Sequence, residues 1–323
     1  MKRILFAAFC LSLVAGGKAL AQQQPQFTHY GFNHMYISPG YSGINKATEF
    51  TMIYRNQWSG YKADFDEGGQ PKTGLFSVSV PVRALKGGIG VNLTSDALGA
   101  TKIKTGTLSY AYHLALGSGR LGIGASGIVS NISKGSYRYL DPGDPSIPYN
   151  SSDTKFDVGA GLWYQSDKFY VGTGVTNLLE SKYQFEADQS LTPGGSGSQT
   201  NSRNLFASAG YNIEAGTSVV ITPTALFKHD FNSDGSSFDI GARATFNQKY
   251  WAGLNYRNQE AVSGLVGIGL LKDNSMKLGF AFDFTTFDEE AKAKSSYEIM
   301  LSYRIPQSPL ATKPAIRTPR YSF

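Results

Sequence analysis

Four histidines are the residues of this chain best suited to bind a metal or transfer a proton: His29, His34, His113 and His229. None of them stands in a His-Glu-x-x-His arrangement or in another paired zinc spacing. His29 and His34 lie close enough in sequence to share a ligand, although polar packing is the simpler interpretation. A membrane enzyme would use His113, which falls on the polar face of its segment, but no convergent serine, histidine and acid set can be assigned. We therefore expect a non-enzymatic protein without a metal or cofactor.

Two stretches match the residue pattern of ligand-binding loops but lack the context that such loops need. Gly122-Ile-Gly-Ala-Ser-Gly127 matches the dinucleotide-binding fingerprint, but it lies within an alternating segment and opens no helix. Glycines on a crowded or curved sheet face are the better interpretation. Asp230-Phe-Asn-Ser-Asp-Gly235 resembles the front of a calcium loop, yet the twelfth position is Gly241, where a bidentate glutamate is needed. We interpret it as a turn between strands.

The first residues have the pattern of a secretory signal peptide. A short basic start, the apolar run 4–15 and Ala19-Leu-Ala21 before the cleavage point predict that residues 1–21 are removed. The only cysteine, Cys10, lies inside that segment. The mature chain therefore has no thiol and forms no disulfide.

The composition favours a protein built from strands. The 323 residues are 41% hydrophobic, 13% aromatic and only 17% charged, and they include 37 glycines. This balance excludes a disordered chain, and no later apolar run is long enough for a membrane helix. Three of the 30 basic residues lie in the signal peptide, so 27 remain against 24 acidic residues. A net charge of +3 gives no indication of nucleic-acid binding.

Short segments of apolar and polar alternation run through the chain after residue 47. In 276–284 large apolar residues occupy one face, and the other face carries Lys277, Gly279, Ala281 and Asp283. A small, polar face is typical of a barrel lumen, and an apolar face with aromatic ends is typical of a lipid-facing wall. The sequence therefore predicts an all-β, outer-membrane antiparallel barrel of about fourteen strands. The approximate spans are 48–58, 73–82, 88–96, 102–114, 120–133, 155–165, 168–176, 203–213, 218–228, 237–247, 250–257, 261–271, 276–283 and 295–305.

The links between these segments are alternately short and mostly long. The turns at 115–119 and 166–167 are short, whereas 59–72, 134–154 and 177–202 are long. Outer-membrane barrels place short turns in the periplasm and long loops outside, so both termini are expected in the periplasm. The predicted parts are a signal peptide (1–21), a periplasmic N-terminal segment (22–47), the barrel (48–305) and a Pro-rich periplasmic tail (306–323).

Charges of both signs fall on the inward face of the predicted strands. If the first strand pairs with the last, Arg55 and Glu298 both point inward and interact across the seam. Mixed inward charges can form ion pairs that close a lumen, which favours a plugged barrel. The inward set is Arg55, Asp157, Asp239, Arg243, Arg257, Asp283, Glu298 and Arg304.

The segment before the barrel carries aromatic residues suited to fill the mouth. The spacing of Phe27, Tyr30 and His34 matches one face of a short helix, which packing against the wall would stabilise. At the other end of the barrel, the longest links are the predicted contact surface for a partner. The candidate contact residues, which lie among stiffening prolines, are Tyr137, Tyr139, Ile147 and Tyr149.

Two motifs near the start carry a family resemblance. The first is Ser38, Pro39, Gly40, Tyr41, Ser42 and Gly43, and the second is Tyr54, Arg55, Asn56, Gln57 and Trp58. They resemble the N-P-A-Y-A-G and Y-R-x-Q-W signature of the PorP/SprF family of Bacteroidetes outer-membrane proteins. Serine replaces the asparagine at 38, and glycine and serine replace the alanines at 40 and 42, while the turn-forming Pro39, Tyr41 and Gly43 are kept.

The resemblance implies a barrel of the type IX secretion and gliding machinery. Its partners would be a large secreted adhesin or other components of that machinery, held by loops and mouth without chemistry, in contact with outer-membrane lipid. The alternative is a conduit for small molecules, a porin or a lipophile transporter, which needs a continuous wet path through the lumen.

Overall fold

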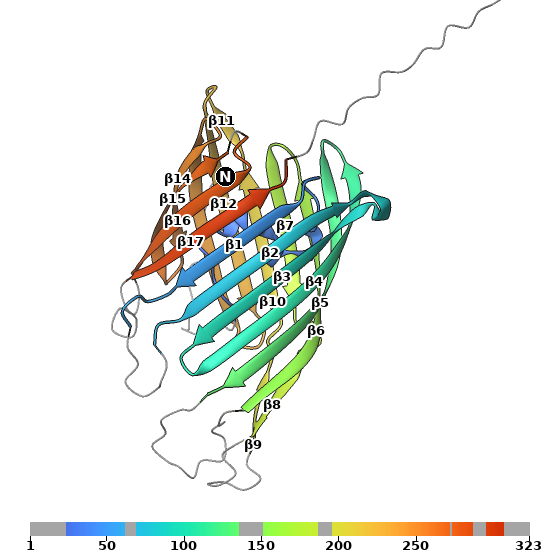
Figure 1. Cartoon of the computed structure of the whole chain (residues 1–323), viewed down its shortest axis with the longest axis vertical. Coiled ribbons are helices and arrows are strands. Elements are labelled where there is room, and N and C mark those ends of the chain that lie inside the picture. The colour runs from blue at the N-terminus through green and yellow to red at the C-terminus, as the bar shows by residue number, and fades with distance from the viewer. Residues whose placement is uncertain are drawn as a thin grey trace, which may run out of the picture.

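The computed structural model describes residues 24–61, 69–135, 151–186, 196–271, 273–286 and 295–306. Within these ranges fourteen strands form a closed antiparallel barrel (Figure 1), which confirms the predicted fold class. The wall strands are β1 (Glu49–Asn56), β2 (Lys72–Val82), β3 (Gly87–Leu98), β4 (Thr101–Leu116), β5 (Gly119–Lys134), β6 (Ser151–Gln165), β7 (Phe169–Thr176), β10 (Asn204–Tyr211), β12 (Val219–Asp230), β13 (Gly235–Phe246), β14 (Tyr250–Arg257), β15 (Ala261–Leu270), β16 (Met276–Thr285) and β17 (Ser295–Arg304). The short strand β11 (Ile213–Ala215) follows β10 and, like β10, pairs with β12.

The wall closes between its first and last strands. β1 pairs with β17 in a register that sets Arg55 opposite Glu298. β10 pairs with β7 on one side and with β12 on the other, so the described strands form a continuous ring. Among the described strands of the wall, closure leaves no edge open to another chain.

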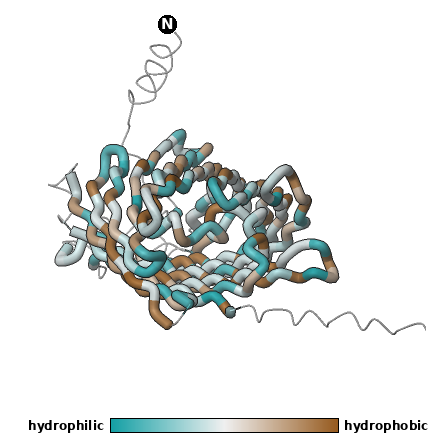
Figure 2. Tube along the Cα trace, turned by 90° about the horizontal axis from the view of Figure 1, so that it is seen from above, coloured by the Kyte–Doolittle hydropathy of each residue, from teal (hydrophilic) through white to brown (hydrophobic). Residues whose placement is uncertain are grey.

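Side chains alternate between lipid and lumen along each strand. On β16, Phe280 and Phe282 are exposed, whereas Ala281 and Asp283 are buried. This period-2 pattern is what the sequence predicts for a lipid-facing wall. Seen end-on, the wall is closed and chain crosses its interior (Figure 2). Among the described residues, no helix is both long and apolar enough to cross a membrane.

The two rims of the barrel differ in their connections. At the turn rim, strands are joined by short turns, such as the one between β4 and β5, and by the 3-10 turn η3 (Arg83–Leu85) between β2 and β3. At the opposite end, the loop rim, β8 (Lys182–Glu186) and β9 (Ser196–Thr200) pair as an additional hairpin beyond the wall (Figure 1). The alternation pattern predicts a link without strands at 177–202, and this prediction is wrong for β8 and β9. Their hairpin forms because Tyr183 and Phe185 are buried against Ile132 of the wall.

Residues 24–47 fold inside the barrel and form what we call the plug. It consists of three short helical turns, η1 (Tyr30–Phe32), α2 (His34–Ile37) and η2 (Pro39–Tyr41). The predicted helical face at 27, 30 and 34 is wrong, because Phe27 packs in a different apolar cluster from Tyr30. Turns this short are not stable alone, so contacts with the wall decide their conformation.

Several predicted features lie outside the described residues: the signal peptide, the tail beyond residue 306 and the loop residues Tyr137, Tyr139, Ile147 and Tyr149. The assignment of these parts stays a prediction.

Candidate functional site

A buried carboxylate on β17, Glu298, is the main attachment point of the plug. Its two oxygens accept hydrogen bonds from the backbone N–H groups of Thr28 and His29, each at 2.8 Å. The ring Nδ1 of His29 lies 2.7 Å from Oε1 of Glu298, and since an ionised carboxylate only accepts, this nitrogen carries the hydrogen. Glu298 is fully buried, so these bonds replace the water that it has lost.

Arg55 of β1 joins the same carboxylate to a second one. Its Nη1 lies 3.3 Å from Oε2 of Glu298, and its Nη2 lies 2.6 Å from Oδ2 of Asp283 on β16. The predicted contact between Arg55 and Glu298 is therefore present. The hydroxyl of Thr28 donates to Asp283 at 2.7 Å and accepts from Arg55 at 3.1 Å. A plug residue thus completes an ion cluster across the seam, where buried charges need partners on all sides.

A second buried pair lies beside the first. The Nε of Arg257 on β14 is 2.7 Å from Oδ1 of Asp239 on β13. The Nη1 of Arg257 is 3.3 Å from Glu260 and 3.8 Å from Asp283, which links the two pairs. The side of the lumen formed by β13, β14, β16, β17 and β1 therefore carries one connected charge network.

Three residues of the predicted inward set do not form closing ion pairs within the described ranges. The guanidinium of Arg243 lies 4.2 Å from the centroid of the Phe32 ring in the plug instead of beside a carboxylate. Arg304 is exposed at the turn rim. Asp157 accepts hydrogen bonds from the backbone N–H groups of Leu179 at 2.9 Å and Ser181 at 3.2 Å. It therefore shapes the link that leads to β8.

Wall glycines allow the plug backbone to lie directly against the sheet. A Cβ placed on Gly124 of β5 would be 2.5 Å from the backbone nitrogen of Gly40, and Gly122 meets the carbonyl of the same residue. Gly161 of β6 and Gly174 of β7 are likewise crowded by plug residues 37–39. The fingerprint-like run at 122–127 is thus explained by a crowded barrel face, as its alternation indicated. The sequence did not predict that these glycines contact the plug. Glycines at inward positions on three neighbouring strands could have indicated a segment packed against the wall.

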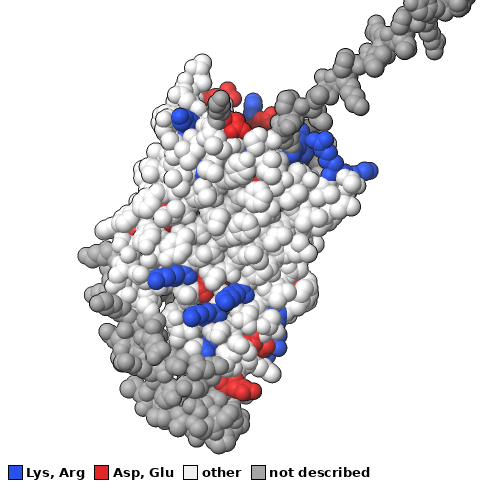
Figure 3. Space-filling view, in the orientation of Figure 1, with Lys and Arg blue, Asp and Glu red and all other residues white. Residues whose placement is uncertain are grey.

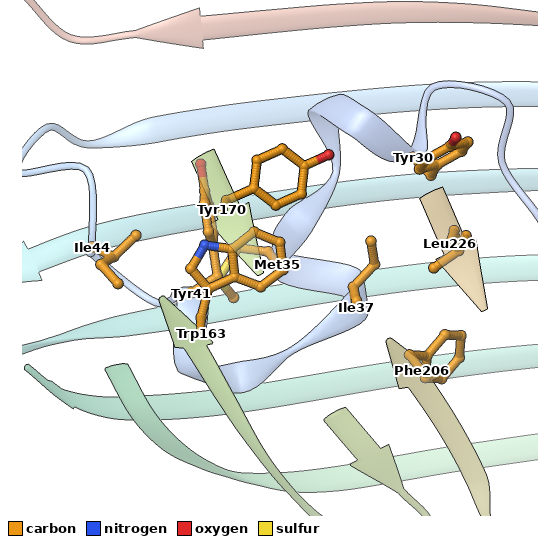
Figure 4. Close-up of a cluster of buried hydrophobic side chains, with 9 residues drawn as sticks. All are labelled: Tyr30, Met35, Ile37, Tyr41, Ile44, Trp163, Tyr170, Phe206 and Leu226. Carbon is orange, nitrogen blue, oxygen red and sulfur yellow. The ribbon is translucent and has the colours of Figure 1, made fainter. Parts of the chain in front are cut away.

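The middle of the plug packs into an aromatic cluster at the wall (Figure 4). The His34 ring centroid lies 4.6 Å from the ring centroids of both Trp163 and Tyr170, and 5.1 Å from that of Tyr41. Burial and the positive charge of Arg243 lower the pKa of His34 to about 3, so this histidine is neutral. His29 lies instead at Glu298, so the two plug histidines hold different positions and share no ligand.

The first family motif shapes the plug. The hydroxyl of Ser38 donates to the carbonyl of Thr173 at 2.8 Å and accepts from the N–H of Gly40 at 3.1 Å, which places Pro39 at the start of η2. The Tyr41 hydroxyl donates to Glu49 at 2.8 Å. Gly43 has φ +67° and its N–H donates to Ser79 of β2 at 2.8 Å. Serine at 38 therefore supplies the wall contact in this chain.

The second motif ends β1 at the loop rim. Tyr54 is exposed on the outer face, whereas the adjacent Arg55 is buried in the charge network. The amide of Asn56 donates to the Tyr297 hydroxyl at 3.0 Å, and the N–H of Trp58 donates to Ser296 at 3.0 Å. Gln57 continues the pairing through its N–H to Pro71, at 2.9 Å. The motif therefore joins β1 to β17 at the seam and ends the strand there.

Two hollows flank the plug. The larger, about 350 Å³, faces the loop rim and is lined by wall hydroxyls such as Thr105 and Ser130 and by Met35 and Tyr36 of the plug. The smaller, about 220 Å³, opens at the turn rim beside Glu49 and Arg304. Among the described residues, no group of three or more histidine, cysteine, aspartate or glutamate side chains is placed to hold a metal ion.

A closed wall with an apolar exterior and a plugged lumen defines an outer-membrane β-barrel. Over residues 19–303 the chain matches the sequence profile described as type IX secretion system membrane protein PorP/SprF, and it belongs to that family. The resemblance carried by the two motifs is therefore confirmed. No match is found among curated proteins.

Similar solved structures are outer-membrane barrels. The toluene transporter TbuX of Ralstonia pickettii is 11% identical with a TM-score of 0.51, and the match covers 85% of this chain and 93% of that one. The toluene transporter TodX of P. putida is 9% identical with a TM-score of 0.48, covering 84% and 93%. A Pseudomonas aeruginosa FadL homologue is 11% identical with a TM-score of 0.43, covering 80% and 89%. At this identity the likeness to TbuX extends to the fold alone.

Proposed function

We propose that this barrel holds a protein partner of the type IX secretion machinery at the outer membrane, either a secreted surface adhesin or a periplasmic component, and does no chemistry itself. Membership of the PorP/SprF family supports a place in the type IX secretion machinery. The observation that carries the proposal is the plug, because a barrel filled by its own N-terminal segment is suited to anchoring and unsuited to steady passage of solutes.

The plug forms hydrogen bonds to several strands around the wall, which supports a permanent closure of the lumen. On the β17 side it is attached through Glu298, as described above. Further around the wall, Asn92 of β3 donates to the carbonyl of Met35 at 2.9 Å, and the ring of His113 on β4 lies 2.8 Å from the carbonyl of Ser42. The Tyr30 hydroxyl lies 2.9 Å from that of Thr224 on β12. Release would break all of these bonds together, so the conduit alternative has little support.

The loop rim is the proposed contact surface. The hairpin of β8 and β9 is fixed there, because the N–H groups of Gln184 and Glu186 donate to Asp153 and Ser151 of β6 at 2.8 and 2.9 Å. Its alternate side chains, including Lys182 and Gln184, remain exposed. A hairpin held in place loses little conformational entropy on binding a partner. We also propose that this rim faces outward and that both termini are periplasmic.

Partner recovery tests the proposal. The tagged barrel is purified from its own membranes as wild type, with 143–149 deleted, or with 187–195 replaced by Asn-Gly, a dipeptide that favours a tight hairpin turn between β8 and β9. Removal of 307–323 is the matched change at the other rim. We expect at least one loop-rim variant to lose the copurifying partner while heat-modifiable folding persists. Full recovery in both loop variants, with loss in the tail variant, would contradict the loop rim as the contact surface.

A further inference from the structure

Three exposed lysines gather on the lipid-facing side of the wall near the loop rim. Lys72 of β2 is paired with Ala97 of β3, which is paired with Lys102 of β4, so the two lysines flank a single strand. Lys104 lies two residues further along β4 on the same face. Basic side chains are visible together over the loop-rim ends of these strands (Figure 3). Within the described ranges none of the three lysines is in an ion pair.

These lysines stand at the edge of the apolar belt. On β4 the outward positions from Gly106 to Leu116 hold only glycine, leucine and tyrosine, and Lys102 and Lys104 lie directly before this run. On β2 the outward positions from Gly74 to Val82 are likewise uncharged, and Lys72 precedes them. Each run is close to the about 9 to 11 residues of a spanning strand. The ammonium groups therefore lie at the level of lipid headgroups.

A groove of about 820 Å³ lies next to the lysines on the same outer face. It is lined by apolar side chains of neighbouring strands, among them Met52, Phe76 and Val129, and it includes Lys104 at its edge. Gly74 and Gly106 contribute to its depth: a Cβ on Gly74 would meet no atom within 4 Å, and one on Gly106 only Leu93 at 3.6 Å. The groove is thus open to an apolar chain running along the wall.

We propose that this face binds a phosphorylated glycolipid of the outer leaflet, with its phosphates on Lys72, Lys102 and Lys104 and an acyl chain in the groove. Clustered lysines at a membrane surface attract anionic headgroups, and a charged donor strengthens the hydrogen bond to phosphate. The assignment of the lipid to the outer leaflet rests on the proposed orientation, in which the loop rim faces outward. Binding in detergent depends neither on orientation nor on a protein partner, so its outcome is independent of the partner-recovery experiment.

Native mass spectrometry of the full-length barrel in detergent tests the site. The probes are diphosphorylated lipid A, the same lipid with its phosphates removed, and phosphatidylglycerol. The variant K72Q/K102Q/K104Q removes the three charges, and G74L/G106L fills the groove while keeping them. K86Q/K168Q/K249Q removes three exposed lysines at the turn rim as the matched control. Heat-modifiable migration confirms folding in each case.

We expect the wild type to retain diphosphorylated lipid A in preference to the other two lipids. The loop-rim lysine variant should bind it about tenfold more weakly, the loss of roughly one charge-assisted hydrogen bond, and the groove variant should weaken both lipid A forms. The turn-rim control should match the wild type. Equal retention of phosphatidylglycerol, or equal losses in the two lysine variants, would overturn the proposal.

Discussion

Glu298 concentrates more of the plug's attachment than any other described side chain. It is buried, faces two backbone N–H groups and the His29 ring, and lies beside Arg55. A charge in this position is stabilising only while its partners stay in place, since removal of one member leaves the others buried and unpaired.

Replacing the carboxylate should therefore loosen plug and seam together. We expect Glu298→Gln to lower the free energy of unfolding by about 3 kcal/mol, because Arg55 and His29 lose their acceptor charge. Urea titration of the folded barrel measures the change. Glu214→Gln, at an exposed carboxylate on β11, is the control and should leave the midpoint unchanged. Equal midpoints for Glu298→Gln and wild type would show that the network does not hold the plug.

His34 gives the plug a pH dependence of defined sign. Its pKa is about 3 in the folded chain against an ordinary value of 6.5, so the unfolded chain takes up a proton first as the pH falls. The stability contributed by neutral His34 is complete above 6.5 and is lost progressively between 6.5 and about 3. Between about pH 7.5 and about pH 4.5 this loss amounts to about 3 kcal/mol.

His34→Phe isolates this effect, because a phenyl ring keeps the aromatic contacts and does not titrate. We expect the free energy of unfolding of this variant to fall less than that of the wild type over the same pH interval. Parallel pH profiles would contradict a buried, neutral His34.

At the scale of elements, β5 is a strand of the wall and also the surface against which the plug packs. Gly124 lies against Pro39 and Gly40 of the plug, where a side chain has no room. We expect Gly124→Val to displace the plug while the strands still close, since valine is well suited to a strand. Limited proteolysis near residues 24–47, read by mass spectrometry of the fragments, should detect the displaced segment.

Gly264→Val on β15 is the matched control for this substitution. A Cβ at Gly264 would meet no atom within 4 Å, so the valine should leave the plug protected. Equal protection of the plug in the two valine variants would mean that the contact with β5 does not determine its position.

Sequence alternation predicted the wall strands because lipid and lumen impose opposite demands on successive residues, as at Ala281 and Phe282. The same parity placed Arg55 opposite Glu298. The plug was not predictable in detail, because its turns depend on partners far along the chain, such as Thr173 for Ser38. The hairpin was missed because β9 is a polar segment of serine, glycine, glutamine and threonine, and only Tyr183 and Phe185 of β8 indicate burial.

At the scale of the whole molecule, the family indicates a role in type IX secretion, and the geometry of the barrel restricts what that role can be. The wall has no open edge in the described ranges, its lumen is occupied by the plug, and the hairpin of β8 and β9 lies at the loop rim. These features agree with a membrane anchor for a protein partner and disfavour a solute channel.

The central claim is that the barrel is closed by its own N-terminal segment. Planar-bilayer recording of the purified full-length protein tests it most directly, with Gly124→Val and a form lacking residues 24–47 as the opened comparisons. The account predicts no steady conductance for the wild type and measurable conductance once the plug is displaced or removed. A large, steady conductance of the folded wild-type barrel would contradict it.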